Sequence, residues 1–293
     1  MTKVLILGSS GLLGSNISRV LDSKFEVIGT HFNNANYSVP HSIHLDIASN
    51  DMFEEIIKKV SPQYVINCIG TTSVEECERF PEKAMLLNAI FPYRVAKASR
   101  EFKFQFLQVS TDHYGTPSNE IRDESMRPIP LNSYGYSKFT GERLVLNESP
   151  TSLILRTNFF GVSARGDHSI LDFAISSFKN SSPVFGYEDV WFTPLGVTQI
   201  GNFLASTLEL NTSGILNLSG SESITKLTFL REVAGALGID PNLVLAAKSS
   251  QFPSSVIRPL NLSLDNSRLL HLGVKLPTLK DMIREELSYR VGA

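Results

Sequence analysis

The sequence predicts an α/β protein, built on a doubly wound parallel sheet with a smaller C-terminal α/β lobe. In the first half, short apolar segments rich in β-branched and aromatic residues alternate with segments of helical length, as in strand–helix–strand units. Beyond Asn158 the alternation becomes irregular and is interrupted by glycine and proline. A length of 293 residues suits one main domain carrying a dependent lobe.

The elements of the first half follow in order along the chain. Strands are predicted at residues 3–8, 25–29, 42–45, 64–68, 103–110 and 152–156. Helices are predicted at residues 12–21, 51–60, about 80–101 and 133–146, where Pro62 follows the second helix and Pro81 opens the third. In the second half only a strand at 214–218 and a helix at 226–237 stand out.

The charge balance excludes several classes of partner. Lys and Arg total 27 against 29 for Asp and Glu, so the formal net charge of -2 provides no long-range attraction for nucleic acid or anionic lipid. No apolar run approaches the roughly 18 residues that cross a bilayer, and the glycine-interrupted N-terminus does not resemble a signal peptide. With only two cysteines, the chain is expected to be cytoplasmic and free of disulfides.

A glycine-rich segment joins the first predicted strand to the first predicted helix. It reads Gly8-Ser9-Ser10-Gly11-Leu12-Leu13-Gly14, a G-x-x-G-x-x-G pattern. In this position the glycines allow a sharp turn, a close approach of backbone amides to a pyrophosphate, and tight packing of the helix. The segment therefore predicts a dinucleotide-binding domain of the Rossmann type over residues 1–158, completed by part of 193–217, with residues 159–293 forming mainly a substrate-binding lobe.

The end of the second strand bears on the choice of dinucleotide. An acidic residue that would bind the ribose 2′-hydroxyl of NAD is absent from residues 29–33, which read GTHFN. Thr30, His31, Ser9 or Ser10 could accommodate a 2′-phosphate, although no arginine is present to bind it. The sequence therefore favours NADP(H) over NAD(H), with use of both remaining open.

Tyr134 and Lys138 form the second motif. Their spacing of four residues puts both side chains on one face of the helix predicted at 133–146. A neighbouring ammonium favours the phenolate and lowers a tyrosine pKa from its ordinary value near 10, so the pair can act as a proton donor near neutral pH. Tyr136 is the competing tyrosine, but it lies two residues from Lys138 and points to another side of the helix.

Polar residues end the strand predicted at 103–110. Ser110, Thr111 and Asp112 stand at the sheet edge where open α/β proteins bind ligands. A hydroxyl group there can hold a carbonyl oxygen of the substrate.

These motifs occur in the order found in extended short-chain dehydrogenases, and the chain resembles the dTDP-4-dehydrorhamnose reductases. The resembling stretches cover nearly the whole chain: residues 8–14, NCIGTTSVEECE at 67–78, LNA at 87–89, VSTDHY at 109–114, PLNSYGYSKFTGE at 130–142, LRTNFF at 155–160 and RPLNLSLDNSRL at 258–269. The resemblance implies NAD(P)H-dependent reduction of the keto group of a nucleotide-linked 4-keto-6-deoxy sugar. It also implies a homodimer.

The resemblance also implies roles for individual residues. Tyr134 would protonate the keto oxygen, Lys138 would bind the nicotinamide ribose and tune Tyr134, and Thr111 would hold the oxygen. Asp112 would contact the substrate. The remaining cofactor contacts would be made by the glycine segment (Gly8, Ser10, Gly11, Leu12, Leu13, Gly14), by Asp46 and Ile47 along the adenine, and by Cys68, Gly70, Thr71 and Asn88 along the middle of the cofactor.

Two departures from the family pattern put the cofactor and the sugar in question. His31 occupies the position of the family's acidic residue. Phe159 stands where the family has a tryptophan in the sugar pocket, and the single Trp191 lies elsewhere. The substrate could therefore be a related nucleotide-linked keto sugar.

Two alternative functions stay open on this scaffold. The first is a nucleotide-sugar epimerase or dehydratase, whose extra acid/base groups would come from Cys68, Cys77 or His113. The second is a non-catalytic NADP-binding regulatory subunit like the β subunit of methionine adenosyltransferase. No cluster of cysteine and histidine has the spacing of a zinc site, so no metal is expected.

Overall fold

The computed structural model describes residues 1–33, 42–116, 120–163, 169–180, 182–252 and 254–289. The chain forms two compact units, each assembled from several segments of the sequence. Unit 1 comprises Met1–Thr111, Asn132–Arg156 and Ile200–Leu216, and unit 2 comprises Asp112–Leu131, Thr157–Gln199 and Asn217–Ala293. Residues 112–131 thus belong to unit 2, whereas the sequence prediction placed them in the first domain.

The centre of unit 1 is a seven-stranded sheet with the strand order β11-β6-β5-β4-β1-β2-β3. Neighbouring strands from β1 to β6 pair in parallel. The bounds are β1 (Lys3–Leu7), β2 (Glu26–His31), β3 (Ile43–His44), β4 (Tyr64–Asn67), β5 (Gln105–Val109), β6 (Leu153–Arg156) and β11 (Gly214–Asn217). The strand order reverses between β1 and β4, which is the point where such sheets bind ligands beyond the carboxyl ends of their strands.

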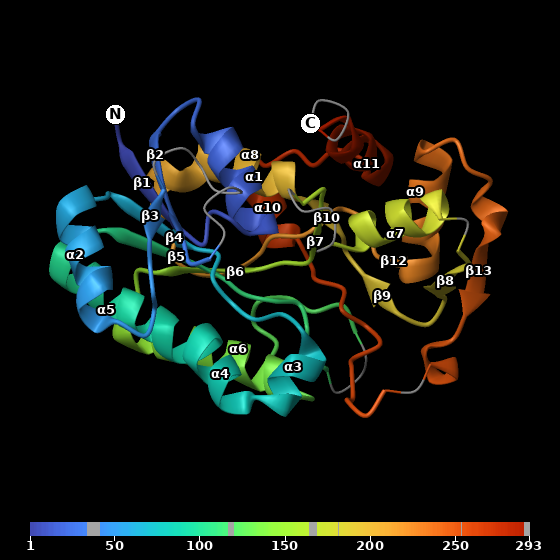
Figure 1. Ribbon diagram of the computed structural model, residues 1–293, viewed down its shortest axis with the longest axis horizontal. Helices are drawn as coiled ribbons and strands as arrows, with labels where there is room; N and C mark the ends of the chain where they lie inside the picture. The colour runs from blue at the N-terminus through green and yellow to red at the C-terminus, as the bar shows by residue number, and fades with distance from the viewer. Residues whose placement is uncertain (34–41, 117–119, 164–168, 181, 253, 290–293) are drawn as a thin grey trace. The chain divides into compact units, whose positions relative to one another are not determined.

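Helices cover both faces of this sheet, so the predicted doubly wound α/β fold is confirmed (Figure 1). The helices are α1 (Leu12–Leu21), α2 (Asn50–Val60), α3 (Val74–Arg79), α4 (Pro81–Met85), α5 (Phe91–Phe102), α6 (Ser133–Glu148) and α8 (Val197–Thr207), followed by a 3₁₀ turn at Leu208–Leu210. In Figure 1, α2, α5 and α6 lie on one face and α1 and α8 on the other. The strand residues Val4, Leu5, Ile6 and Leu7 are completely buried, as expected for a sheet covered on both faces.

The helix predicted over about 80–101 is interrupted in its middle. A turn of π-helix, Leu86–Ile90, separates α4 from α5, and the short helix α3 precedes them. The carbonyl of Asn88 in this turn lies so close to α6 that a Cβ on Gly141 would be 2.1 Å from its oxygen. Single π-helical turns are common at functional sites, because they redirect one side chain without ending the helix.

Unit 2 is built from short strand pairs and helices. β7 (Phe159–Phe160) pairs with β10 (Leu195–Gly196), β9 (Trp191–Phe192) with β12 (Ile224–Thr225), and β8 (Val184–Tyr187) with β13 (Val244–Ala247). The helices are α7 (Ile170–Lys179), α9 (Lys226–Ala236), α10 (Ser267–His271) and α11 (Leu279–Ser288), with 3₁₀ turns at Pro241–Leu243 and Ser249–Gln251. The buried rings of Phe160, Phe192 and Phe229 pack edge to face in its core. Within the described ranges, no helix is long and apolar enough to span a membrane.

Candidate active site

The glycine segment forms the turn between β1 and α1. Gly8 has a φ of +83°, a backbone conformation that side chains with a Cβ rarely adopt. A Cβ on Gly14 would lie 2.3 Å from the carbonyl oxygen of Gly8, so only glycine allows α1 to approach this closely. The sequence prediction of a tight turn leading into a helix is therefore correct in geometry.

The start of α1 suits a pyrophosphate. Its N-cap residue is Gly11, no side chain caps the helix, and no acidic residue lies in its first turn. The first backbone amides of a helix lack partners within the helix and carry a partial positive charge, which favours an anion. Leu12 is half-buried and Leu13 is buried, so each could contribute its backbone amide rather than its side chain.

The serine and threonine next to this turn are occupied in holding it to β2. Thr30 is fully buried and its hydroxyl accepts a hydrogen bond from the amide of Gly8 at 3.1 Å. Ser9 is also fully buried and donates its hydroxyl to the carbonyl of Thr30 at 3.0 Å. Both hydroxyls thus already bond within the turn, and the suggestion that either could receive a 2′-phosphate stays a prediction.

His31 and Ser10 remain as the candidates for the ribose end of the cofactor. His31 is half-buried at the end of β2, and its Nδ1 lies 2.7 Å from the hydroxyl of Ser42. Ser10 is half-buried in the glycine turn. No carboxylate ends β2, so the acidic residue typical of NAD specificity is absent from this position.

The two predicted adenine contacts follow β3. Asp46 and Ile47 are half-buried, and the carboxylate of Asp46 accepts a hydrogen bond from the amide of Ala48 at 2.9 Å. The carbonyl of Ile47 accepts one from the guanidinium of Arg94 on α5 at 2.7 Å. This loop is therefore fixed at the same carboxyl edge of the sheet as the glycine turn.

Asn88 connects the segment after β4 to helix α6. Its side-chain oxygen accepts a hydrogen bond from the amide of Thr71 at 3.1 Å, and its nitrogen donates to the carbonyl of Thr71 and to the hydroxyl of Ser137. A Cβ on Gly70 would lie 2.8 Å from the Asn88 oxygen and 3.0 Å from the Lys138 nitrogen. The structure thus brings Gly70, Thr71, Asn88 and Lys138 together, while Ser137 is a member of this network that the sequence prediction missed.

Helix α6 presents Tyr134 and Lys138 inward. Its N-cap is Asn132, whose side chain accepts a hydrogen bond from the amide of Gly135 at 2.9 Å. Tyr134 and Lys138 are 7% and 6% exposed, whereas Tyr136 is 60% exposed. The fold thus encloses the ring of Tyr134 and leaves the ring of Tyr136 exposed, in agreement with the predicted choice of Tyr134.

Lys138 reaches the carboxyl end of β5. Its ammonium lies 3.4 Å from the carbonyl oxygen of Val109, two residues before Thr111, which is itself buried. Burial lowers the pKa of Lys138 from its ordinary 10.5 to about 8, while the carboxylate of Glu142 opposes this shift. Burial thus makes the ammonium of Lys138 easier to deprotonate than that of an exposed lysine.

The thiols considered for an epimerase lie near Lys138 but are poor bases. Burial raises the pKa of Cys68 to about 12 and also raises the pKa of Cys77. Both thiols are therefore protonated at neutral pH. This weakens the epimerase or dehydratase alternative, which stays a prediction.

A buried ion pair lies one helical turn beyond Lys138. The guanidinium of Arg156, at the end of β6, binds both carboxylate oxygens of Glu142 through Nε at 3.0 and 3.2 Å and through Nη2 at 2.7 Å. The hydroxyl of Ser110 donates to the same carboxylate at 2.6 Å. The sequence analysis did not single out Arg156 or Glu142, although Glu142 follows Lys138 by four residues and so shares its face of the helix.

Asp112, the predicted substrate contact, belongs to unit 2. Its side chain is 3% exposed, and its carboxylate accepts a hydrogen bond from the amide of Asn158 at 2.6 Å. The guanidinium of Arg122 donates to its backbone carbonyl at 3.0 Å. Burial raises the pKa of Asp112 to about 6, against the opposing effects of Asn158, Lys226 and Arg122. Phe159, the other predicted substrate contact, is half-buried in β7 of the same unit.

Lys226 is a further charged residue of unit 2 that no sequence motif indicated. It opens α9, and its ammonium lies 3.3 Å from the centroid of the Phe192 ring. Burial lowers its pKa to about 8, while the carboxylate of Asp112 raises it. Lys226 and Asp112 thus influence each other's pKa within unit 2, from positions more than a hundred residues apart in the sequence.

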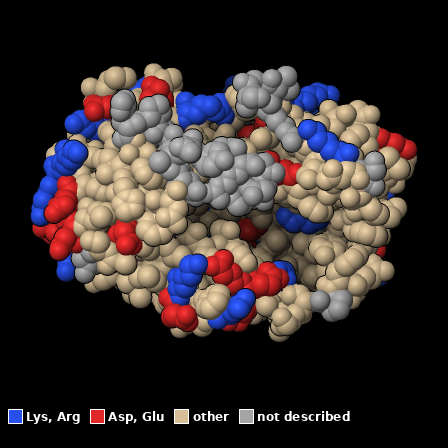
Figure 2. All heavy atoms as spheres, in the orientation of Figure 1, with Lys and Arg blue, Asp and Glu red and all other residues tan. Residues whose placement is uncertain are grey.

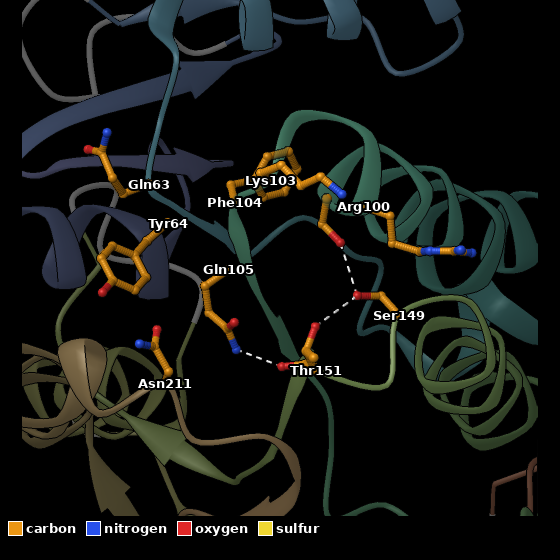
Figure 3. A pocket seen from close by; sticks show the side chains of 10 residues that line it. Gln63, Tyr64, Arg100, Lys103, Phe104, Gln105, Ser149, Thr151 and Asn211 are labelled. Carbon is orange, nitrogen blue, oxygen red and sulfur yellow. Dashed lines mark hydrogen bonds between the residues drawn. The ribbon is translucent and has the colours of Figure 1, made fainter.

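A pocket of about 480 Å³ opens at the opposite edge of the unit 1 sheet (Figure 3). It lies where β4 and β5 begin and is lined by Gln63, Tyr64, Ser99, Arg100, Lys103, Phe104, Gln105, Ser149, Thr151 and Asn211. The hydroxyl of Ser149 is hydrogen-bonded to the hydroxyls of Ser99 and Thr151, and Figure 3 shows Ser149 and Thr151 pointing toward each other. None of the predicted site residues lines this pocket, because they follow the carboxyl ends of the strands.

Surface charge and possible metal ligands were compared with the predicted site over the described residues and the face drawn in Figure 2. On the face drawn in Figure 2, described basic and acidic side chains are interspersed, so this face shows no extended area of one sign. Among the described residues, no group of three or more histidine, cysteine, aspartate or glutamate side chains could hold a metal ion.

Comparisons with known proteins place these features in context. The profile described as the RmlD substrate binding domain matches residues 1–289. The probable low-salt glycan biosynthesis reductase Agl14 of Haloferax volcanii is 30% identical over 94% of each chain. The methionine adenosyltransferase 2 subunit beta of Danio rerio is 26% identical over 97% of this chain and 90% of its own. The crystal structure of dTDP-4-dehydrorhamnose reductase from Bacillus anthracis in complex with NADP superposes with a TM-score of 0.87 at 22% identity, covering 99% of this chain and 100% of the other.

Proposed function

Because the chain belongs to the RmlD substrate binding domain family, we propose that it uses NADPH or NADH to reduce the keto group of a nucleotide-linked 4-keto-6-deoxy sugar. The reductase name of the Haloferax volcanii relative supports an oxidoreductase. The Bacillus anthracis structure, a dTDP-4-dehydrorhamnose reductase bound to NADP, supports the cofactor class and the kind of sugar. Homodimer formation stays a prediction.

The observation that carries this proposal is the enclosed network around Lys138. Tyr134 and Lys138 are buried on one face of α6, and Lys138 lies close to Gly70 and to the end of β5. This network is at the same sheet edge as the glycine turn that leads into α1. A proton donor and a dinucleotide site on one edge of a sheet are what carbonyl reduction requires.

The residues present fit a nicotinamide dinucleotide. The turn from Gly8 to Gly14 would bind the pyrophosphate through backbone amides, and Asp46 and Ile47 would line the adenine. Cys68, Gly70, Thr71 and Asn88 would lie along the middle of the cofactor, and Lys138 would bind the nicotinamide ribose. When bound, the reduced cofactor supplies the hydride that is added to the carbonyl carbon.

The chain's own residues would handle the carbonyl oxygen. Tyr134 would donate the proton to this oxygen while Thr111 holds it by a hydrogen bond. The ammonium of Lys138, one helical turn from Tyr134, stabilises the phenolate that remains. Asp112 and Phe159 would contact the sugar, through hydrogen bonds and ring packing respectively.

The proposed cofactor preference is NADP(H), with NAD(H) also accepted. His31 provides no negative charge to repel a 2′-phosphate, and Ser10 stands beside it in the glycine turn. The variant His31→Asp should repel a 2′-phosphate. It should raise the ratio of kcat/KM with NADH to kcat/KM with NADPH about tenfold or more, because one unfavourable charge contact at a partly buried site is worth about 1.4 kcal/mol or more. Ser42→Ala, which removes the hydroxyl near His31, is the matched control. An unchanged ratio in His31→Asp would show that this position does not read the 2′-group.

The direct test is turnover of a defined substrate. Purified protein is mixed with a dTDP-linked 4-keto-6-deoxy sugar and with NADPH or NADH, and loss of the reduced nicotinamide is followed by absorbance. The proposal expects turnover with formation of the 4-hydroxy sugar. Binding of either cofactor without turnover of dTDP- or UDP-linked keto sugars would refute the reductase assignment.

A second candidate is a non-catalytic, NADP-binding regulatory subunit. The identity to the Danio rerio methionine adenosyltransferase subunit, over nearly the whole of this chain, favours it. Co-purification with a methionine adenosyltransferase catalytic subunit, together with absent turnover, would support this candidate. Turnover of any keto sugar would exclude a purely regulatory role.

A further inference from the structure

Glu142 joins three elements at the carboxyl edge of the unit 1 sheet. It lies on α6, four residues after Lys138, and its carboxylate is bound by the side chains of Ser110 and Arg156. Ser110 follows β5 and Arg156 ends β6. The two charged side chains are 1% and 2% exposed, so the pair is removed from water.

The contact with Ser110 fixes the position of Thr111. The amide of Ser110 donates to the carbonyl of Leu155 on β6 at 2.7 Å, and its hydroxyl donates to Glu142 at 2.6 Å. Ser110 is thus held from both its backbone and its side chain. Thr111 is the next residue, so the Ser110 contacts restrict where the Thr111 hydroxyl can be.

The charge of Glu142 also acts on Lys138. The groups that influence the ammonium of Lys138 are Glu142 on the same helix, Cys68 after β4 and Cys77 on α3. Glu142 comes first among these favourable influences, and both thiols are protonated at neutral pH because burial raises their pKa. Glu142 is therefore the carboxylate that opposes the burial of Lys138.

We propose that Glu142 is a positioning residue, which fixes the end of β5 before Thr111 against α6 and balances the buried ammonium of Lys138. The inference rests on the proposed function for its catalytic consequence. The part concerning Lys138 rests only on cofactor binding, which can be measured without knowing the sugar.

The test measures NADPH affinity as a function of pH by quenching of protein fluorescence. In the wild type, affinity should fall as pH rises past about 8, because Lys138 loses its charge there. Glu142→Gln keeps the size of the side chain but removes its charge, so the midpoint should move down by about one pH unit or more. Glu148→Gln, at the end of α6 in an exposed pair with Arg100, is the matched control and should leave the midpoint in place.

Two further variants separate the two roles of Glu142. Ser110→Ala keeps the ion pair, so it should lower kcat about tenfold, as expected when one hydrogen bond to a charged group is lost, without moving the midpoint. The double variant Glu142→Gln/Arg156→Met removes both buried charges, and it replaces the single variant if Glu142→Gln does not fold, as judged by circular dichroism. The double variant should shift the midpoint down less than the single variant, because loss of the Arg156 cation offsets part of the loss of the Glu142 anion.

The pH midpoint of NADPH affinity tests the role of Glu142, and turnover of a keto sugar tests the proposed function, so the two can fail independently. An unmoved midpoint in a folded Glu142→Gln variant, an unchanged kcat in Ser110→Ala, or a wild type without any midpoint near pH 8 would overturn the role of Glu142. A wild type that turns over no keto sugar, but shows the expected midpoint shift, would refute the reductase proposal and leave the electrostatic role of Glu142 supported.

Discussion

Lys138 of unit 1 and Lys226 of unit 2 each lie near one carboxylate, in different surroundings. The pKa of each is lowered to about 8 by burial and is raised by that carboxylate. The partner of Lys138, Glu142, is held by a guanidinium and a hydroxyl on two strands. The partner of Lys226, Asp112, accepts a hydrogen bond from the neutral amide of Asn158, and its own pKa is raised to about 6.

The charge network around Lys138 is fixed by several hydrogen bonds, whereas the one around Lys226 is held by fewer. In unit 1 the carboxylate is held in place by Arg156 and Ser110, so the geometry around Lys138 is set before any ligand binds. In unit 2 burial raises the pKa of the carboxylate to about 6 and lowers the pKa of the ammonium to about 8. We therefore expect the network around Lys138 to serve cofactor binding and the network around Asp112 to serve substrate binding, as proposed above.

Removing the ammonium of Lys138 should have the largest effect on stability. The pKa of Lys138 is about 8 in the folded chain and 10.5 ordinarily, so the unfolded chain binds more protons between these values. The folded state is therefore penalised below pH 8, and the penalty disappears as pH rises to 10.5. Lys138→Met should raise the free energy of unfolding at pH 7 by up to about 3 kcal/mol, measured by urea denaturation.

The stability prediction has an internal control and a clear contradiction. Lys280→Met removes a lysine of unit 2 that is 65% exposed, so it should change the free energy of unfolding by less than about 0.5 kcal/mol. The advantage of Lys138→Met over the wild type should also shrink when the measurement is repeated at pH 10. A Lys138→Met protein that is less stable at pH 7 would contradict this reading of the network.

Removing Lys226 should have a smaller effect, confined to the substrate. Lys226→Met should raise the KM for the sugar and leave NADPH affinity unchanged, because Asp112, the proposed substrate contact, loses the cation that lowers its pKa. The pKa of Asp112 should rise above about 6, because Lys226 lowers it, so the acid side of the pH profile should move to higher pH. Steady-state kinetics would measure both effects between about pH 5 and pH 9, which roughly covers the range where these groups titrate. An unchanged KM, together with an unchanged acid side of the pH profile, would contradict the role assigned to Lys226.

The two regions also differ in what the sequence could predict. The glycine turn, Tyr134, Lys138 and the end of β5 were predictable because turn chemistry and helical spacing are local properties of the chain. Glu142 shares this helical spacing, but its partner Arg156 ends another strand and no local pattern connects them. Asp112 and Lys226 are brought together only by the folding of unit 2.

Two further features depended on contacts that a linear pattern does not contain. The π-helical turn around Asn88 accompanies the close approach of α6 at Gly141, far along the chain. Thr30 and Ser9 carry the right chemistry for a phosphate, yet their hydroxyls bond to the backbone of the turn. Neither the close approach of α6 nor the hydrogen bonds of these hydroxyls can be recognised in the sequence alone.

The most direct test of the account compares two conservative tyrosine variants on the same helix. Tyr134→Phe should lower kcat for keto-sugar reduction by about 10²–10⁴-fold, the usual contribution of a positioned proton donor, with NADPH affinity changed less than about threefold. Tyr136→Phe, at an exposed position two residues away, should retain wild-type kcat. Equal kcat values in the two variants would contradict the assignment of Tyr134 as the proton donor.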